Sequence, residues 1–180
     1  METKIGSTVI RLVQGDITKE VTDVIVNAAN TSLRGGGGVD GAIHRAGGPE
    51  ILQECIQKYP EGCKTGEARI TTAGQMSAKY VIHTPGPIWR GGQQNEKRLL
   101  KHCYRNSLLL ATEYNAKSIA FPSISTGVYG FPIERASKIA LSTVIENLAS
   151  TTITEVCFVL FSDSDYQIYE KNLQRIGKEE

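Results

Sequence analysis

Short apolar runs alternate with segments of helical periodicity along the chain. Apolar and polar side chains alternate from Thr8 to Gln14, which predicts a strand with one covered face. The run from Asp23 to Asn27 is rich in β-branched residues, as is typical of a strand covered on both faces. Further short segments, bounded by Gly, Pro or polar residues, are expected to be strands at 68–72, 79–83, 117–121 and 155–161. The pattern therefore predicts about six strands.

Several segments between these strands repeat their apolar residues with the period of a helix. Two such helices would each turn one face to the core, with Leu100, Tyr104, Ser107, Leu108 and Ala111 on the first and Ala136, Ala140, Thr143, Val144 and Leu148 on the second. Pro49 and Pro132 suit the first position of a helix, and Asp163 suits the cap of the last helix.

The order of these elements favours an α/β fold. Strands and helices alternate along most of the chain, which predicts a three-layer α/β/α sandwich around one central sheet. Two strands follow each other closely within residues 68–84, so the sheet is expected to be mixed. No change in composition marks a linker, and we expect a single domain over residues 1–180.

Composition and charge narrow the range of partners. The formal net charge is +1, and acidic and basic residues are interleaved, so we expect no direct nucleic-acid binding. The four cysteines form no Cys-x-x-Cys pair and the chain starts without an apolar signal core, which fits the cytoplasm. The three histidines lack the spacing of a metal site, and no apolar run reaches the roughly 18 residues of a membrane span. We expect no essential metal.

Two glycine-bearing loops carry the candidate chemistry. The first follows Asn27-Ala28-Ala29-Asn30 and leads from a strand into a helical pattern over residues 39–46. The second spans residues 123–130, again between a strand and a helix. Free backbone N–H groups and a helix N-terminus can hold a phosphate at such a place. Two loops of this kind in one chain predict a diphosphate ligand.

Three other interpretations of the glycine run are weaker. Residues 36–41 fit the pattern G-x-G-x-x-G, but eight residues separate Asn27 from Gly36, and the next strand lacks an acidic residue at its end. No Lys-Ser or Lys-Thr follows the glycines, which argues against a Walker-type loop. A flexible spacer would have polar, low-complexity flanks. A loop that contacts a ligand through its backbone is the better interpretation.

Four motifs follow one another along the chain. They are Gly15-Asp16-Ile17-Thr18, Asn27-Ala28-Ala29-Asn30, the glycine run ending in Val39-Asp40-Gly41-Ala42-Ile43-His44, and Ile124-Ser125-Thr126-Gly127-Val128-Tyr129-Gly130. Together they resemble the macrodomain family over nearly the whole chain. Within that family the chain is most similar to the MacroD-type branch, which includes bacterial O-acetyl-ADP-ribose deacetylases and mono-ADP-ribosyl-protein hydrolases.

This resemblance implies that ADP-ribose is the ligand. Asp16 would accept a hydrogen bond from the adenine amino group beside the backbone of Ile17, and Phe161 would pack on the base. Asp16 could instead cap a turn, and Phe161 could belong to the core. Backbone N–H groups would hold the diphosphate between Gly35, Gly36, Gly37, Gly38 and Val39 on one side and Ser125, Thr126, Gly127, Val128 and Tyr129 on the other.

Within the second loop, the hydroxyls of Ser125 and Thr126 would be available to the ligand. Gly127 is expected to tolerate a side chain least. Tyr129 would cover the distal ribose, or it could be an ordinary half-buried surface aromatic.

The resemblance also implies a set of catalytic residues. Asn30 would hydrogen-bond a hydroxyl of the distal ribose, and Asp40 would orient and activate a water. The nearby phosphate would make Asp40 a stronger base. His44 lies four residues after Asp40, so the two side chains share a helix face and could interact. Both residues could instead have structural roles at a helix N-terminus. The segment from His83 to Trp89 follows a strand and is expected to shape a wall near the site, without a chemical role.

Three functions are compatible with these features. The first is an enzyme without a cofactor that removes mono-ADP-ribose from protein Asp or Glu, deacetylates O-acetyl-ADP-ribose, or does both. The second is a non-catalytic reader of ADP-ribose. The third is a regulatory partner of an RNA-processing enzyme such as a ribonuclease. The presence of Asp40 favours the enzyme, because readers often lack an acidic residue there.

Overall fold

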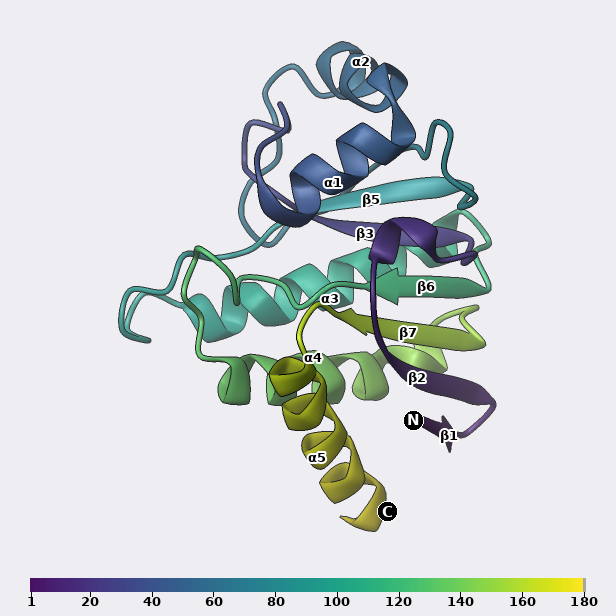
Figure 1. The fold of residues 1–180 in the computed structure, drawn as a ribbon, viewed down its shortest axis with the longest axis vertical. Coiled ribbons are helices and arrows are strands. Elements are labelled where there is room, and N and C mark those ends of the chain that lie inside the picture. The colour runs from purple at the N-terminus through teal and green to yellow at the C-terminus, as the bar shows by residue number, and fades with distance from the viewer. Residues whose placement is uncertain (180) are drawn as a thin grey trace.

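The computed structural model describes residues 1–179, which form a mixed seven-stranded sheet covered by helices on both faces (Figure 1). The strand order is β1-β2-β7-β6-β3-β5-β4. The edge strands β1 and β4 are antiparallel to their neighbours, and the five inner strands are parallel. The strands are β1 (Glu2–Ile5), β2 (Thr8–Gln14), β3 (Val24–Ala29), β4 (Arg69–Thr72), β5 (Tyr80–Pro85), β6 (Ser118–Phe121) and β7 (Glu155–Leu160).

The helices form two layers, as the pattern of elements predicts. Helices α3, α4 and α5 pack side by side on one face of the sheet, while α1, α2 and the short helix η1 cover the other. The bounds are η1 (Ile17–Lys19), α1 (Gly38–Gly47), α2 (Pro49–Lys58), α3 (Glu96–Glu113), α4 (Ile133–Asn147), η2 (Leu148–Ser150) and α5 (Asp163–Glu179). The prediction of a three-layer α/β/α sandwich is therefore confirmed.

The sequence pattern predicts six strands, and the additional strand is β1. Its residues alternate between exposed and partly buried positions, and it pairs only with β2 at the edge of the sheet. Polar side chains such as Thr3 and Lys4 are common on edge strands, where they discourage pairing with another chain. Because these side chains are polar, a search for apolar runs does not detect such a strand.

The starts of α4 and α5 differ from the expectation by one residue, whereas α2 begins at Pro49, as predicted. Pro132 precedes the first residue of α4. Asp163 was expected to cap α5, yet Oγ of Ser162 accepts the backbone N–H of Asp165 at 3.1 Å. Ser162 is therefore the cap, and Asp163 lies in the first turn of the helix.

Side chains of the inner strands alternate between the two helical layers. In β3, Val24 and Val26 belong to the larger core beneath α3 and α4, whereas Ile25 faces the smaller core beneath α1 and α2. In β5, Ile82 faces the larger core and Val81 the smaller one. This period of two places every second residue of β3 and β5 beneath α1.

The connections that follow β3 and β6 lead to opposite faces of the sheet. These strands are parallel neighbours, but β3 leads into α1 on one face and β6 leads into α4 on the other. Ligands bind to open α/β sheets at such a switch point, beyond the carboxyl ends of the strands. We call residues 30–37, between β3 and α1, the first loop, and residues 122–132, between β6 and α4, the second loop.

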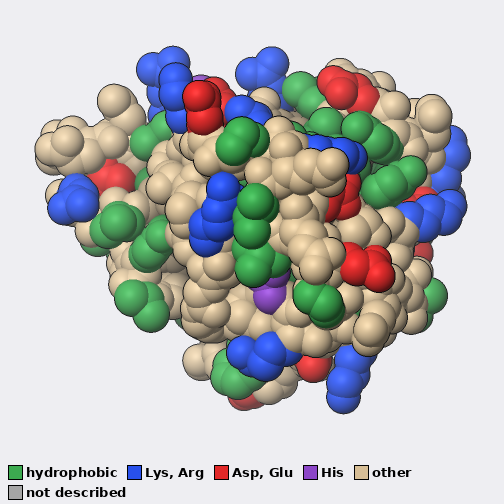
Figure 2. All heavy atoms as spheres, turned by 90° about the horizontal axis from the view of Figure 1, so that it is seen from above, with side chains coloured by type: hydrophobic (Ala, Val, Ile, Leu, Met, Phe, Trp, Pro, Cys, Tyr) green, Lys and Arg blue, Asp and Glu red, His purple; other side chains and the backbone are tan. Residues whose placement is uncertain are grey.

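The surface over α1 and α2 carries mixed charges. Figure 2 shows acidic and basic side chains interspersed on this face, without a continuous basic stripe. No helix within residues 1–179 is long and apolar enough to cross a membrane. Among the same residues, no group of three or more His, Cys, Asp or Glu side chains is arranged to hold a metal ion.

Candidate active site

A groove of about 360 Å³ lies between the two loops at the switch point. Most of the residues expected to bind the ligand or to react with it line this groove. The lining residues are Ala28, Ala29, Asn30, Gly36, Gly37, Gly38, Val39, Asp40, Gly86, Ser123, Ile124, Ser125, Gly127, Val128 and Tyr129.

Six of the expected site residues lie outside this lining. Ile17 is buried in the core below η1, and the carbonyl of Gly35 accepts a hydrogen bond within the first loop. Asp16 and Phe161 lie at the ends of β2 and β7, which are adjacent strands. His44 contacts Asp40 from the next turn of α1, and the hydroxyl of Thr126 donates a hydrogen bond to Ser123 within the second loop.

Asp16 caps η1, which matches the alternative interpretation of this residue. Its Oδ1 accepts the backbone N–H of Thr18 at 3.0 Å and the Thr18 hydroxyl at 2.7 Å. The side-chain hydrogen bond and then the backbone one lower the pKa of Asp16. Phe161 is 91% exposed and so is not part of the core. Both side chains remain accessible for a ligand.

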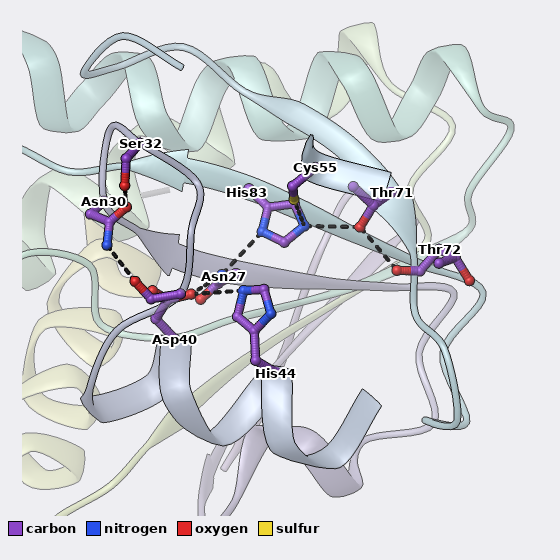
Figure 3. Close-up of polar contacts among 10 residues, drawn as sticks. Asn27, Asn30, Ser32, Asp40, His44, Cys55, Thr71, Thr72 and His83 are labelled. Atoms are coloured by element: carbon purple, nitrogen blue, oxygen red, sulfur yellow. Dashed lines mark hydrogen bonds and ion pairs between the residues drawn. The ribbon is translucent and has the colours of Figure 1, made fainter. Parts of the chain in front are cut away.

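Asp40 lies in the first turn of α1, where the helix dipole favours a carboxylate. Its Oδ1 accepts a hydrogen bond from Nδ2 of Asn27 at 2.8 Å, and Nε2 of His44 is 3.3 Å from the same oxygen (Figure 3). The four-residue spacing of Asp40 and His44 thus places them in contact, as expected. The other oxygen, Oδ2, is 3.1 Å from the point where a Cβ at Gly36 would lie. It therefore faces the first loop.

Asn30 is fixed on both sides of its amide. Its Nδ2 donates to the carbonyl of Gly35 at 2.7 Å, and its Oδ1 accepts the hydroxyl of Ser32 at 2.7 Å. The same Nδ2 is 3.4 Å from the position of a Cβ at Gly36. A side chain at Gly36 would therefore crowd both Asn30 and Asp40, which explains a glycine at this position.

Asn27 and His83 are site residues whose roles the sequence analysis did not identify. Asn27 on β3 and His83 on β5 are register partners, and both face α1. Of the segment from His83 to Trp89 that was expected to shape a wall, Gly86 lines the groove, whereas His83 is 1% exposed and lies beneath Asp40. The available signal was a polar residue at an inward position of a strand that is otherwise apolar.

His83 is neutral at physiological pH. Burial, followed by the nearby His44, lowers its pKa to about 4. The thiol of Cys55 lies 3.9 Å from Nε2 of His83, and burial raises the pKa of that thiol to about 11. The buried groups near Asp40, His83 and Cys55, are therefore both uncharged at physiological pH.

The second loop combines side-chain hydrogen bonds at its start, from Tyr104 and Tyr169, with backbone hydrogen bonds over residues 125–131. The N–H of Phe131 donates to the carbonyl of Ser125 at 2.9 Å, and the N–H of Gly130 donates to the carbonyl of Gly127 at 3.0 Å. Ser125 has φ of 68°, and its buried Oγ has no hydrogen-bond partner within residues 1–179. The hydroxyl of Thr126 donates to the carbonyl of Ser123 at 3.1 Å. Of the two hydroxyls expected to be available, only that of Ser125 is free.

Beside the second loop, Gly86 has no room for a side chain, whereas Gly127 has. A Cβ at Gly127 would meet no atom of the described chain within 4 Å, so the empty groove accommodates one. A Cβ at Gly86 would overlap Oγ of Ser125 and approach the side chain of Ile124. The close approach of Gly86, just after β5, to the second loop requires glycine at that position.

A third segment supports the second loop from outside. The N–H of Trp89 donates to the carbonyl of Tyr129 at 2.8 Å, and the Trp89 ring packs on Phe131 with 4.7 Å between centroids. The segment after Trp89 is held by Glu96, which is 1% exposed and accepts backbone N–H groups of Arg90, Gly92 and Gln94. Burial raises the pKa of Glu96, but these bonds outweigh it and lower the pKa to about 2.

The groove at the switch point and its two loops define a nucleotide-binding type of α/β protein, and sequence comparison specifies the family. The chain belongs to the Macro domain family, whose pattern matches residues 26–140. A macro domain-containing protein of Caldanaerobacter subterraneus subsp. tengcongensis is 58% identical over 94% of this chain and 98% of its own length. The O-acetyl-ADP-ribose deacetylase of Escherichia coli K12 is 53% identical over the same shares of the two chains.

Solved structures agree with this assignment. The Oceanobacillus iheyensis macrodomain with ADP is 48% identical and superposes with a TM-score of 0.95, over 100% of this chain and 97% of that one. The Trypanosoma brucei macrodomain in complex with ADP-ribose is 44% identical, with a TM-score of 0.84 over 91% of this chain and 68% of that one. The resemblance inferred from the four motifs is confirmed.

Proposed function

We propose that this protein is an ADP-ribose-binding hydrolase that cleaves ADP-ribosyl esters. The observation that carries the proposal is the position of Asp40, whose Oδ1 is tethered while Oδ2 faces the first loop beside Asn30. A groove that binds a diphosphate on two backbone loops does not by itself need this carboxylate. A carboxylate with one free oxygen is suited to act as a general base.

In this proposal the diphosphate lies between the two loops. Backbone N–H groups of residues 36–39 and 125–129 donate to it, and the free hydroxyl of Ser125 adds a further donor. The adenine extends toward the ends of β2 and β7. There Asp16 retains Oδ2 as an acceptor for the adenine amino group, and the exposed ring of Phe161 stacks on the base.

The distal ribose then lies over Asn30 and Asp40. Asn30 contacts a ribose hydroxyl, Tyr129 covers the sugar, and Asp40 takes a proton from a water as that water attacks. Attack on the ester carbonyl of O-acetyl-ADP-ribose forms a new C–O bond and breaks the bond between the acyl carbon and the ribose oxygen, so that acetate is released and the ribose oxygen takes the proton from Asp40. Attack on the anomeric carbon instead breaks the bond between that carbon and the carboxylate oxygen, so that the water oxygen becomes the ribose hydroxyl. The protein carboxylate leaves and can take the proton from Asp40.

The similarity to the Escherichia coli O-acetyl-ADP-ribose deacetylase supports the deacetylase reaction in particular. Hydrolysis of ADP-ribosylated Asp or Glu is the second reaction of the same site, because both substrates place an ester next to the distal ribose. The groove is open at the side of Val128, which is fully exposed, so a protein carrying the modification can approach.

A reader function without catalysis is the alternative. The two loops would serve a reader equally well, and binding alone does not separate the two functions. The tethered Asp40 favours the enzyme, because a buried carboxylate is costly to retain where only binding is needed.

The decisive experiment compares both substrates with the unmodified protein. We expect calorimetry to show ADP-ribose binding, and chromatography to show release of acetate from O-acetyl-ADP-ribose or of ADP-ribose from an ADP-ribosylated glutamate peptide. Binding without release from either substrate would identify a reader. Absence of binding would overturn the proposed function as a whole.

A further inference from the structure

Asp40 rests on a buried row of polar side chains that crosses three strands. Asn27 on β3 is 0% exposed and His83 on β5 is 1% exposed, and the two are register partners. Thr71 on β4 continues the row, 2.9 Å from His83 (Figure 3). These residues are embedded in an apolar layer that includes Ile25 and Val81. Burying polar groups there is costly unless each has a partner.

The amide of Asn27 has one possible orientation. Its Nδ2 lies 2.8 Å from Oδ1 of Asp40 and 3.1 Å from Nδ1 of His83, so the two N–H bonds of the amide serve these two acceptors. Rotating the amide would place two oxygens against each other at Asp40. The Oδ1 of Asn27 has no partner within residues 1–179, which means that the donors alone determine the orientation.

The tautomer of His83 follows from this orientation. Because Nδ1 accepts from Asn27, the ring proton is on Nε2, which donates to Oγ1 of Thr71. The Thr71 hydroxyl then donates to the carbonyl of Thr72 at 2.9 Å. The hydrogen bonds thus run in one direction along the row from Asn27 to the backbone of β4. The neutral state of His83 is consistent with this arrangement.

We propose that Asn27, held by the Nε2–H tautomer of His83, is the positioning residue for Asp40. Asn27 binds Oδ1 from below while His44 contacts the same oxygen from α1, so that Oδ2 stays directed toward the groove. Asn27 is not part of the groove lining and does not touch the ligand. This inference rests on the proposed function, in which Oδ2 takes the proton of the attacking water.

A variant of Asn27 separates positioning from binding. Asn27→Ala is expected to lower kcat on the order of 10- to 100-fold, as for the loss of a hydrogen bond to a charged group. KM and the calorimetric affinity for ADP-ribose should change less than about 3-fold, because the groove lining is intact. An unchanged kcat in a folded Asn27→Ala protein would overturn the inference.

Asn172→Ala is the matched control. Asn172 is also a buried asparagine whose Nδ2 donates one hydrogen bond, to Ser137 at 2.6 Å, and whose Oδ1 has no partner within residues 1–179. It lies on α5, on the other face of the sheet. We expect it to lose stability but retain kcat. A loss of kcat equal to that of Asn27→Ala would assign the effect to general destabilisation and overturn the inference.

A second measurement requires neither turnover nor a variant of Asn27. ¹⁵N NMR of the histidine rings should show His83 as the neutral Nε2–H tautomer at pH 7, and Thr71→Val should alter its Nε2 resonance. A His83 ring protonated on Nδ1 would overturn the inference even if Asn27→Ala failed to fold. If wild-type protein shows the expected tautomer but no turnover, the proposed function fails and the hydrogen-bonded row stands.

Discussion

The two loops that flank the groove are built in different ways. Behind the first loop lie side chains that are buried and hydrogen-bonded to one another, with Asn27 and His83 beneath Asp40. In the second loop, the hydroxyls of Tyr104 and Tyr169 anchor the first residues, but residues 125–131 are held by bonds between their own backbone groups and by the N–H of Trp89. Val128 at its tip is fully exposed. Buried side chains therefore position the acidic group on one side of the groove, and backbone bonds shape residues 125–131 on the other.

This difference matches two separate tasks. Gripping a diphosphate needs several N–H groups at fixed positions, which a backbone loop supplies without any charged side chain. Activating a water needs one group that can take a proton, and its position must be held by its surroundings. The comparison predicts that changes to the side chains that position Asp40 alter turnover, whereas changes at the second loop alter affinity.

The largest expected effect concerns Asp40. Asp40→Ala should lower turnover by about 10²- to 10⁴-fold, the usual contribution of a positioned general base, while ADP-ribose still binds in calorimetry. Asp165→Ala is the control, because Asp165 also lies in the first turn of a helix but does not line the groove. Undiminished hydrolysis would remove Asp40 from the mechanism and end the distinction between the loops.

Ser125 tests the second loop. Ser125→Ala removes a buried hydroxyl that has no partner within residues 1–179, so the free enzyme should keep its stability. ADP-ribose affinity should fall by about 10- to 100-fold, as for a hydrogen bond to a charged group. The control Ser107→Ala loses the bond to the carbonyl of Cys103 and should reduce stability but not affinity. Calorimetry and denaturant unfolding separate the two outcomes, and an unchanged affinity would argue against a phosphate contact at Ser125.

Two glycines sharpen the comparison further. Gly86→Ala forces a methyl group against Ser125 and Ile124, and should lower the free energy of unfolding by about 1–3 kcal/mol. Gly127→Ala adds its methyl group to open space and should unfold at the same denaturant concentration as the wild type. Equal midpoints for both variants would show that Gly86 does not constrain the second loop.

The smallest expected effect is the response of each side to acid. The folded pKa of Glu96 is about 2, below its usual 4.5, so the stability it contributes is present above pH 4.5 and is lost as the pH falls toward 2. Glu96→Gln should therefore unfold more easily than wild type at pH 7, with a difference that narrows below pH 4.5. The fluorescence of Trp89, the single tryptophan of the chain, reports on this segment during unfolding.

The first loop should respond at higher pH. The folded pKa of His83 is about 4, below its usual 6.5, so the unfolded chain binds more protons between these values and the fold loses stability as the pH falls from 6.5 to 4. Amide hydrogen exchange of residues 36–40 should thus increase in this range, before the Trp89 signal changes. Simultaneous changes in both signals would mean that the two sides are not independently built.

The sequence was sufficient for most of the fold and much of the groove. Strand and helix periods located every strand except β1, whose polar residues carry no strong pattern, and every helix except the short η1 and η2. The glycine run before Asp40 indicated a loop that meets a helix N-terminus, and the structure places Asn30 and Asp40 in the same groove. These features are local, because they depend on residues that are near one another in the chain.

The sequence by itself determined which segments become strands, helices and backbone loops, since alternation, helical period and glycine act over a few residues. Only the tertiary structure decided what supports Asp40 and what crowds the second loop. The register of β3 against β5 pairs Asn27 with His83, and the approach of Gly86 to Ser125 depends on how separate segments pack. Such contacts join residues more than 30 positions apart, and no local pattern encodes the partner.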